Sequence, residues 1–291
     1  MIKRLGFFTL LLYLFFSCGK DVPTPAYLQI NKYSLLENID AVSPQGALSN
    51  NFSDAWVYID GKLMGVFELP VKLPIGQAGG KTITIVAGVR NNGIESTKKR
   101  FPFVENYETY VTLTPNETTV VNPTTRYYST LSFWIEDFED PTSVALTETY
   151  YSKAHLHASS DPSILKYGAY FGEVDLTTQD SLWDAITSDQ LVLPPGREVY
   201  LEIDYYTTNS ILTGINAYNV SGGTSTQNPN ILINQQSADK VVWKKIYIDL
   251  NEIVSYDINA NYFKIALTSI LSVEEQSSSK ICIDNIKVIH N

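Results

Sequence analysis

The sequence contains little cysteine and little histidine, two residue types on which much protein chemistry depends. Of its 291 residues, two are cysteine and three are histidine. A serine-hydrolase triad therefore has little to draw on, and no G-x-S-x-G, H-E-x-x-H or P-loop pattern occurs. Negative charge exceeds positive charge: the net charge is -10, and no basic patch appears in the sequence. Nucleic acid is excluded as a partner, since its phosphates need such a patch.

Two clusters of polar residues invite a chemical interpretation, and neither has the spacing that the chemistry needs. In EDFED, Phe138 interrupts the row of carboxylates that a glycosidase strand would present on one face. In AHLHASSD, His155 and His157 would project from one strand face and could hold a metal together with Asp161. No further ligand is evident, so the favoured interpretation is a solvated strand. We expect a protein that is not an enzyme.

Long apolar runs are absent except at the N-terminus. Lys3 and Arg4 precede an apolar run over residues 5–16. This run of about a dozen residues is too short to span a membrane, which needs ~20 residues of helix. It has the length of a signal-peptide hydrophobic region. Ser17 and Cys18 follow, and polar residues come next, which resembles the lipobox of bacterial lipoproteins in a looser form that is familiar among Bacteroidota.

The lipobox resemblance implies a signal peptide over residues 1–17, acylation of Cys18 and a short tether over residues 18–26. Two or more acyl chains anchor a protein stably to a bilayer. We therefore expect an outer-membrane lipoprotein of the cell envelope, on either the periplasmic or the surface face of that membrane. The alternative is an ordinary secretory leader that contains a cysteine. The second cysteine, Cys282, alternates with polar residues in ICIDNIKVI and is predicted to be a buried thiol in a strand.

Short alternating runs rich in Tyr, Thr, Val and Ile dominate the rest of the chain and predict an all-β protein with two β-sandwich domains. Residues 27–128 form the first block. Asp60-Gly61 predicts a tight hairpin turn, and Asn92-Gly93 predicts a second turn. Here VYIDGKLMGVFELP followed by GKTITIVAGV resembles PEGA-type and immunoglobulin-like sandwiches, which are usually spacers or docking modules.

Residues 132–291 form the second block, in which we predict a larger jelly-roll of roughly eight to ten strands. Its opening DFED and its closing ICIDNIKV resemble the paired first and last strands of carbohydrate-binding-type, galactose-binding-like jelly-rolls. LTTQDSLWDAIT, residues 176–187, is the best candidate for one short helix or a helical turn. Trp134 and Trp243 are expected in the core.

The jelly-roll resemblance implies a structural calcium ion held by the opening glutamate and the closing aspartate. The matching residues are Glu139 and Asp284, with Asp137 and Asp140 nearby. Calcium takes six to eight oxygen ligands, and carboxylates on adjacent strands supply several of them. The alternative is a solvated turn before Pro141 with Asp284 exposed at a sheet edge.

Aromatic residues are the remaining signal, with 19 Tyr, 12 Phe and 4 Trp. Sugars typically stack on exposed aromatic rings that are flanked by polar side chains. The candidates in the second block are Tyr150, Tyr151, Tyr167, Tyr170, Trp183, Tyr205, Tyr206 and Tyr218, of which we select Tyr151, Tyr170, Trp183, Tyr206 and Tyr218 as ligand-binding residues. The competing interpretation is that these rings only cover sheet faces.

The combined prediction is a membrane-anchored envelope lipoprotein that acts as a non-catalytic binding module, with glycans as the leading ligand class. That ligand class follows from the resemblance of fold and not from site chemistry. The alternative is a structural or assembly lipoprotein that contacts another envelope protein and binds no sugar. A hydrolase with an unrecognised site is a third hypothesis.

Overall fold

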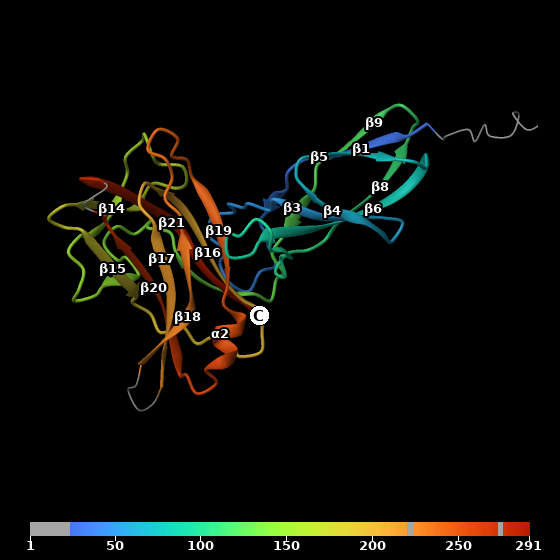
Figure 1. Ribbon diagram of the computed structural model, residues 1–291. Coiled ribbons are helices and arrows are strands. Elements are labelled where there is room, and N and C mark those ends of the chain that lie inside the picture. Colours follow the sequence, from blue (N-terminus) through green and yellow to red (C-terminus); the bar gives the residue numbers. More distant parts are fainter. Residues whose placement is uncertain (1–23, 220–223, 273–275) are drawn as a thin grey trace, which may run out of the picture.

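The computed structural model describes residues 24–219, 224–272 and 276–291, and it is an all-β structure as predicted. Figure 1 shows two β-rich halves, one formed by the earlier part of the chain and one by the later part. In the described residues the helical element is α2 (Asn251–Tyr256). No described helix has the length and apolar character needed to cross a membrane.

The first half contains two main sheets that pack against each other over one hydrophobic cluster. One sheet has the order β5-β1-β9, and the other has the order β4-β3-β6, with β7 and β8 both paired to β6. β2 and β10 form a small parallel pair. The bounds are β1 (Ala26–Ile30), β2 (Ser34–Leu36), β3 (Asp54–Ile59), β4 (Lys62–Glu68), β5 (Val71–Ile75), β6 (Gly79–Arg90), β7 (Lys98–Arg100), β8 (Tyr107–Leu113), β9 (Thr118–Val121) and β10 (Thr124–Arg126).

The turn chemistry of this half follows the sequence closely. Asp60 and Gly61 both have positive φ, 49° and 77°, and they join β3 to β4 in the predicted two-residue hairpin. Asn92 and Gly93 also have positive φ, in the longer loop between β6 and β7. Asn116, with φ of 66°, turns the chain after β8. The strand that follows it, β9, pairs with β1 in the other sheet.

The second half is a sandwich of two antiparallel sheets, which we call the inner and the outer sheet. The inner sheet contacts the first half and has the order β13-β14-β21-β16-β19, with β11 also paired to β21; the outer sheet has the order β12-β15-β20-β17-β18. The bounds are β11 (Ser132–Glu136), β12 (Leu146–Glu148), β13 (Leu156–Ser159), β14 (Phe171–Thr177), β15 (Leu182–Thr187), β16 (Val199–Thr207), β17 (Ile211–Tyr218), β18 (Thr224–Ile233), β19 (Lys244–Asp249), β20 (Tyr262–Ile270) and β21 (Ser278–His290).

The opening and closing strands of this sandwich are neighbours, as the sequence predicts. β11 pairs antiparallel with β21, from Ser132 opposite His290 to Glu136 opposite Ile286. The helix expected over residues 176–187 is wrong. β14 ends at Thr177 and β15 begins at Leu182, and the two-residue alternation of β15 buries Trp183 together with the other core-facing residues.

The strands β16, β19 and β21 of the inner sheet are buried on both faces over most of their length, which is unusual for an antiparallel sandwich sheet. Along β16, Leu201 and Ile203 face the core between the two sheets. Tyr200 belongs instead to the cluster of the first half, and Glu202 and Asp204 are buried on the same face as Tyr200. The first half therefore covers a sheet face that would otherwise meet water.

A buried network of charges lies at this junction. Lys245 Nζ is 3.0 Å from Glu202 Oε2 and 3.4 Å from Asp204 Oδ2, and it donates a 3.0 Å hydrogen bond to Ser49 Oγ. Tyr127 donates its hydroxyl to Glu202 Oε1 at 3.1 Å. Burial alone would lower the pKa of Lys245, but the two carboxylates outweigh it and raise the pKa.

A second buried lysine completes the network. Lys287 Nζ donates to the carbonyl oxygens of Gln45, at 2.6 Å, and of Ala47. Burial first, and the nearby charge of Lys245 next, lower the pKa of Lys287 to about 8. Ser49, Gln45 and Ala47 belong to the irregular segment 37–53 that precedes β3, so this segment attaches the first half to the inner sheet.

We predict that Lys245→Met lowers the free energy of unfolding by about 3–5 kcal/mol, because it leaves the buried Glu202 and Asp204 carboxylates without their cation. Urea unfolding followed by fluorescence measures this change. The neighbouring Lys244 is exposed, so Lys244→Met is the matched control and should change stability by less than about 0.5 kcal/mol. Equal stabilities for the two variants would contradict the structural role of Lys245.

Candidate functional site

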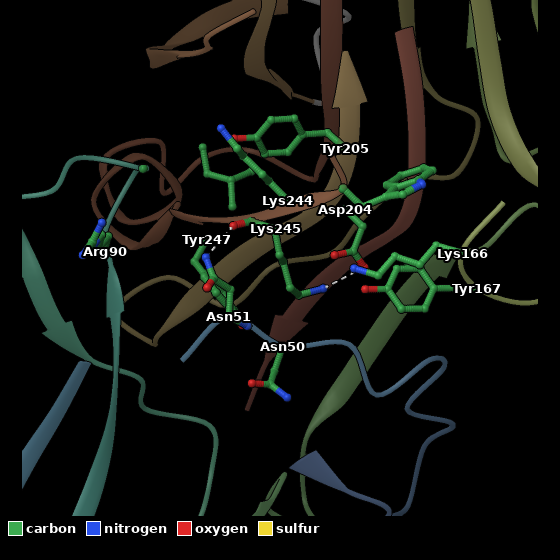
Figure 2. Close-up of a pocket in the computed structure, with 13 residues that line it drawn as sticks. Asn50, Asn51, Arg90, Lys166, Tyr167, Asp204, Tyr205, Lys244, Lys245 and Tyr247 are labelled. Carbon is green, nitrogen blue, oxygen red and sulfur yellow. Dashed lines mark hydrogen bonds and ion pairs between the residues drawn. The ribbon is translucent and has the colours of Figure 1, made fainter. Parts of the chain in front are cut away.

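A pocket of about 400 Å³ lies at the junction of the two halves. Its lining comes from residues 50–51, Arg90 and Gly93 in the first half, and from residues 166–167, 204–205 and 243–247 in the second. Figure 2 shows these segments arranged around the pocket, with the polar ends of several side chains gathered near Asp204. The pocket thus depends on both halves being docked together.

The floor of the pocket is the outer end of the charge network. The side chains of Asp204 and Lys245 are only 3% and 2% exposed. Asn51 is fixed above them, because its backbone N–H donates to the Tyr247 hydroxyl at 2.8 Å and its side-chain amide donates to the Lys245 carbonyl at 3.3 Å. Asn50, its half-buried neighbour, also lines the pocket.

An aromatic cluster forms one wall. The ring of Trp243 lies 6.4 Å from that of Tyr167, 6.0 Å from that of Tyr206 and 5.9 Å from that of Phe171, measured between centroids. The indole N–H of Trp243 donates to the carbonyl oxygen of Ile164 at 2.6 Å. This bond ties the connection between β13 and β14, which carries Tyr167, to the start of β19.

The opposite wall is the loop between β6 and β7. Asn92 donates its backbone N–H to the Tyr247 carbonyl at 2.8 Å and accepts the Asp249 N–H at 2.9 Å. Gly93 has φ of 70°, and a Cβ there would lie 3.0 Å from Ile246, so this close approach needs glycine. The Asn92-Gly93 turn therefore positions a wall of the pocket in addition to reversing the chain.

The selected aromatic residues lie outside the pocket lining. Tyr151 is exposed in the loop after β12, and Tyr206 contributes to the aromatic wall only through its contact with Trp243. Tyr218 stacks on Tyr262 in the outer sheet, with centroids 4.7 Å apart. Tyr170 is half-buried and packs against the core of the second half.

Two predictions about tryptophan need correction. Trp183 is fully buried in the core of the second half, so it offers no ring to a ligand, because β15 turns that face inward. Trp243, expected in the core, is half-buried and lines the pocket. Trp134 is also half-buried; it packs against the core while its indole N–H donates to Asp189 at 2.8 Å.

Sequence reasoning found part of the pocket. Tyr167 and Tyr205 were among the aromatic candidates, and both line it. Asn50, Asn51 and Lys244 were missed, because each is an ordinary polar residue that becomes part of a site only when distant segments meet. The feature of the sequence that could have indicated these residues is the pair Asn50-Asn51.

The residues expected to hold calcium are partly assembled. Burial raises the pKa of Asp284 to about 8, and the nearby charges of Asp204, Glu139 and Asp137 add to the rise. Glu139, however, accepts the backbone N–H groups of Ala169 and Tyr170, at 2.8 Å and 3.2 Å. Among the described residues, no group of three or more Asp, Glu, His or Cys side chains is arranged to hold a metal ion.

The other polar clusters have local structural roles. Glu136 accepts the Phe138 N–H at 2.6 Å and also the N–H of Ala145, so it braces the turn after β11. The exposed His155 pairs with Glu148 through a 2.8 Å contact to Nδ1. Hydrogen bonding to that carboxylate raises the pKa of His155.

Calcium therefore stays a prediction, and thermal unfolding tests it. Bound calcium should raise the unfolding midpoint in excess calcium relative to excess chelator, since a ligand of the folded state stabilises that state. Asp284→Asn should abolish the difference, whereas Asp161→Asn, a substitution in an exposed turn, should keep it. An unchanged midpoint in the wild-type chain removes the calcium site.

A scan against protein-family models and a search of curated proteins both found no match. The PEGA-type and lipoprotein resemblances of the N-terminal region therefore remain predictions. Cys18 itself lies outside the described residues.

Solved structures similar to this chain include the CBM22-1 xylan-binding domain of Xyn10C from Paenibacillus barcinonensis, with 11% identity, a TM-score of 0.37, and coverage of 54% of this chain and 92% of that one. A carbohydrate-binding module specific for non-crystalline cellulose, CBM28, has 11% identity, a TM-score of 0.38, and coverage of 52% and 90%. The enzymatically active domain of bacteriophage CBA120 tailspike protein 4 has 12% identity, a TM-score of 0.37, and coverage of 52% and 20%. Likeness at this level carries no argument about what this chain binds.

Proposed function

We propose that this protein is a non-catalytic saccharide-binding protein of the cell envelope, anchored to the outer membrane through an acylated Cys18. The observation that carries the binding proposal is the junction pocket, which aromatic rings line together with amide, carboxylate and ammonium groups. A saccharide presents an apolar ring face and a rim of hydroxyl groups, so its binding needs both kinds of contact at once.

The pocket offers both. Tyr167 and Trp243 supply rings on one wall. Asn50 and Asn51 also line the pocket, and a side-chain amide supplies a donor and an acceptor of the kind that pairs with hydroxyl groups. Because the pocket is lined mostly by polar side chains, it suits a hydrophilic ligand better than a lipid or an apolar peptide.

The arrangement favours binding over hydrolysis. Asp204 is the single carboxylate among the described lining residues, and it is already engaged by Lys245 and by the hydroxyl of Ser49. A glycosidase needs two carboxyl groups that flank the scissile bond, one of them free to donate a proton. Glu202, the nearest buried acid of the network, is held by Lys245 and Tyr127.

We predict that Tyr167→Ala and Asn50→Ala each weaken saccharide binding by about 1 kcal/mol, roughly fivefold, through loss of ring contact or of a hydrogen bond. A glycan array probed with the full chain identifies a ligand, and isothermal titration calorimetry then measures the variants. Tyr151→Ala is the matched control, because Tyr151 is an exposed tyrosine outside the pocket. If Tyr151→Ala loses binding while Tyr167→Ala keeps it, the binding site lies outside the pocket. If no saccharide on the array binds, the proposed function is refuted.

The membrane anchor is supported by the leader and by Cys18. We predict that Cys18→Ala shifts the protein from the membrane fraction to the soluble fraction, since acyl chains supply the anchoring free energy at ~0.8 kcal/mol per buried methylene. Cell fractionation with immunoblotting measures the shift, and Cys282→Ala serves as the control, because that thiol is buried in β21. Membrane retention of the Cys18→Ala protein would rule out acylation as the anchor.

One surface favours the alternative role of contacting another envelope protein. β4 is an edge strand of its sheet and exposes Leu63, Met64 and Val66. An exposed apolar edge strand presents unpaired backbone groups to which another chain can add a strand. This role would be favoured if the glycan array yields no ligand while the protein still assembles with other proteins at the membrane.

A further inference from the structure

A second pocket, of about 290 Å³, lies in the first half beside the junction pocket. Its lining residues are Lys32, Tyr33, Asn50, Asn51, Phe52, Ser53, Glu68, Leu69 and Arg90. Three of them, Asn50, Asn51 and Arg90, also line the junction pocket. Because these residues belong to both linings, the two pockets are neighbours along segment 50–51 and the end of β6.

The second pocket adjoins the junction pocket at the end away from the aromatic wall. The residues that the two linings share exclude Tyr167 and Trp243, which line the junction pocket alone. In Figure 2, Asn50 and Asn51 lie between Arg90 on the left and Tyr167 on the right. A ligand that starts at the aromatic wall therefore reaches the second pocket by passing the two asparagines.

Arg90 is fixed at the boundary between the two pockets. Its guanidinium group lies 2.8 Å from the carboxylate of Glu68, which lines the second pocket, and 3.6 Å from that of Asp54. Asp54 is completely buried, so it holds the arginine to the body of the first half. The boundary is consequently part of the folded framework and does not depend on a ligand.

The second pocket has a buried apolar floor and a polar rim. Tyr33, Phe52 and Leu69 form the floor and belong to the core of the first half. Lys32 and Glu68 are exposed at the rim, where they supply a hydrogen-bond donor and an acceptor for hydroxyl groups. This pocket therefore suits a saccharide unit that is held by hydrogen bonds, without an exposed ring on which to stack.

We propose that the ligand is an oligosaccharide chain that occupies both pockets, with one unit beside Tyr167 and further units beside Lys32 and Glu68. This proposal rests on the proposed saccharide-binding function and adds the length of the ligand to it. The junction pocket alone, at about 400 Å³, is near the lower end of the ~300–1,000 Å³ that is typical of ligand sites. A chain that continues into the second pocket adds contacts there, while the cost of lost translational and rotational freedom arises only once.

The experiment measures affinity against chain length with the full chain purified in detergent. The probes are a disaccharide, a tetrasaccharide and a hexasaccharide built from the repeating unit of the saccharide that binds on the glycan array. Isothermal titration calorimetry gives each affinity. We expect the hexasaccharide to bind roughly five- to tenfold more tightly than the disaccharide, from one or two additional hydrogen bonds in the second pocket.

Two substitutions and one control test the residues. Lys32→Ala and Glu68→Ala should each weaken hexasaccharide binding by roughly two- to fivefold and leave disaccharide binding unaffected. Unchanged disaccharide affinity in Glu68→Ala also shows that Arg90 keeps its place without this partner. Lys153→Ala, at an exposed lysine that lines neither pocket, should bind every probe as the wild-type chain does.

The outcomes separate the two proposals. If the hexasaccharide binds no more tightly than the disaccharide, or if the gain in affinity is undiminished in both second-pocket variants, the two-pocket proposal is overturned and saccharide binding stands. If no saccharide binds, on the array or in the titrations, both proposals are overturned.

Discussion

The burial of four charged side chains between the two halves is the constraint on which the rest of the structure depends. Glu202, Asp204, Lys245 and Lys287 all lie on one face of the inner sheet, where a free sandwich would present them to water. Their burial costs desolvation free energy, which mutual pairing offsets only when the geometry is right. Apolar contacts of Tyr200, Tyr247 and Ile289 with the core of the first half supply the driving force for docking. The charges make that docking specific, because a displaced arrangement would leave one of them buried without a partner.

The same docking creates the pocket. Its floor is the outer edge of the charge network, and its walls come from segment 50–51, from the loop after β6 and from the connection that carries Tyr167. A backbone hydrogen bond from Asn92 to Tyr247 fixes one wall directly to β19. The pocket is therefore held by contacts within the protein itself, and the proposed saccharide would lose little free energy to ordering of its walls.

Alternation and turn chemistry made the fold predictable in outline, because both are local properties. Asp60-Gly61 specifies its hairpin without help from the rest of the chain, and the pairing of β11 with β21 followed from a resemblance of their sequences. The failures have non-local causes. In VYLEIDYY and WKKIYID, acidic and basic residues alternate with apolar ones, a pattern typical of a strand with one face in water. Only the docked first half shows that this face is buried. The pocket could not be foreseen for the same reason, since Asn51 and Lys245, which share a 3.3 Å hydrogen bond, meet only through that docking.

The proposed ligand pocket and the interface between the two halves share residues. Because the pocket walls belong to both halves, a ligand that contacts both must stabilise the docked arrangement relative to any separated one. The coupling is reciprocal: whatever free energy docking adds to binding, binding adds to docking. Lys244 and Lys245 lie on opposite faces of β19. Lys245 is turned toward Glu202 and Asp204 and holds the halves together, whereas Lys244 is exposed beside Tyr205, its partner on β16. The pocket and the docking of the halves therefore share one side chain, Lys245, which lines the pocket and carries the buried ion pairs.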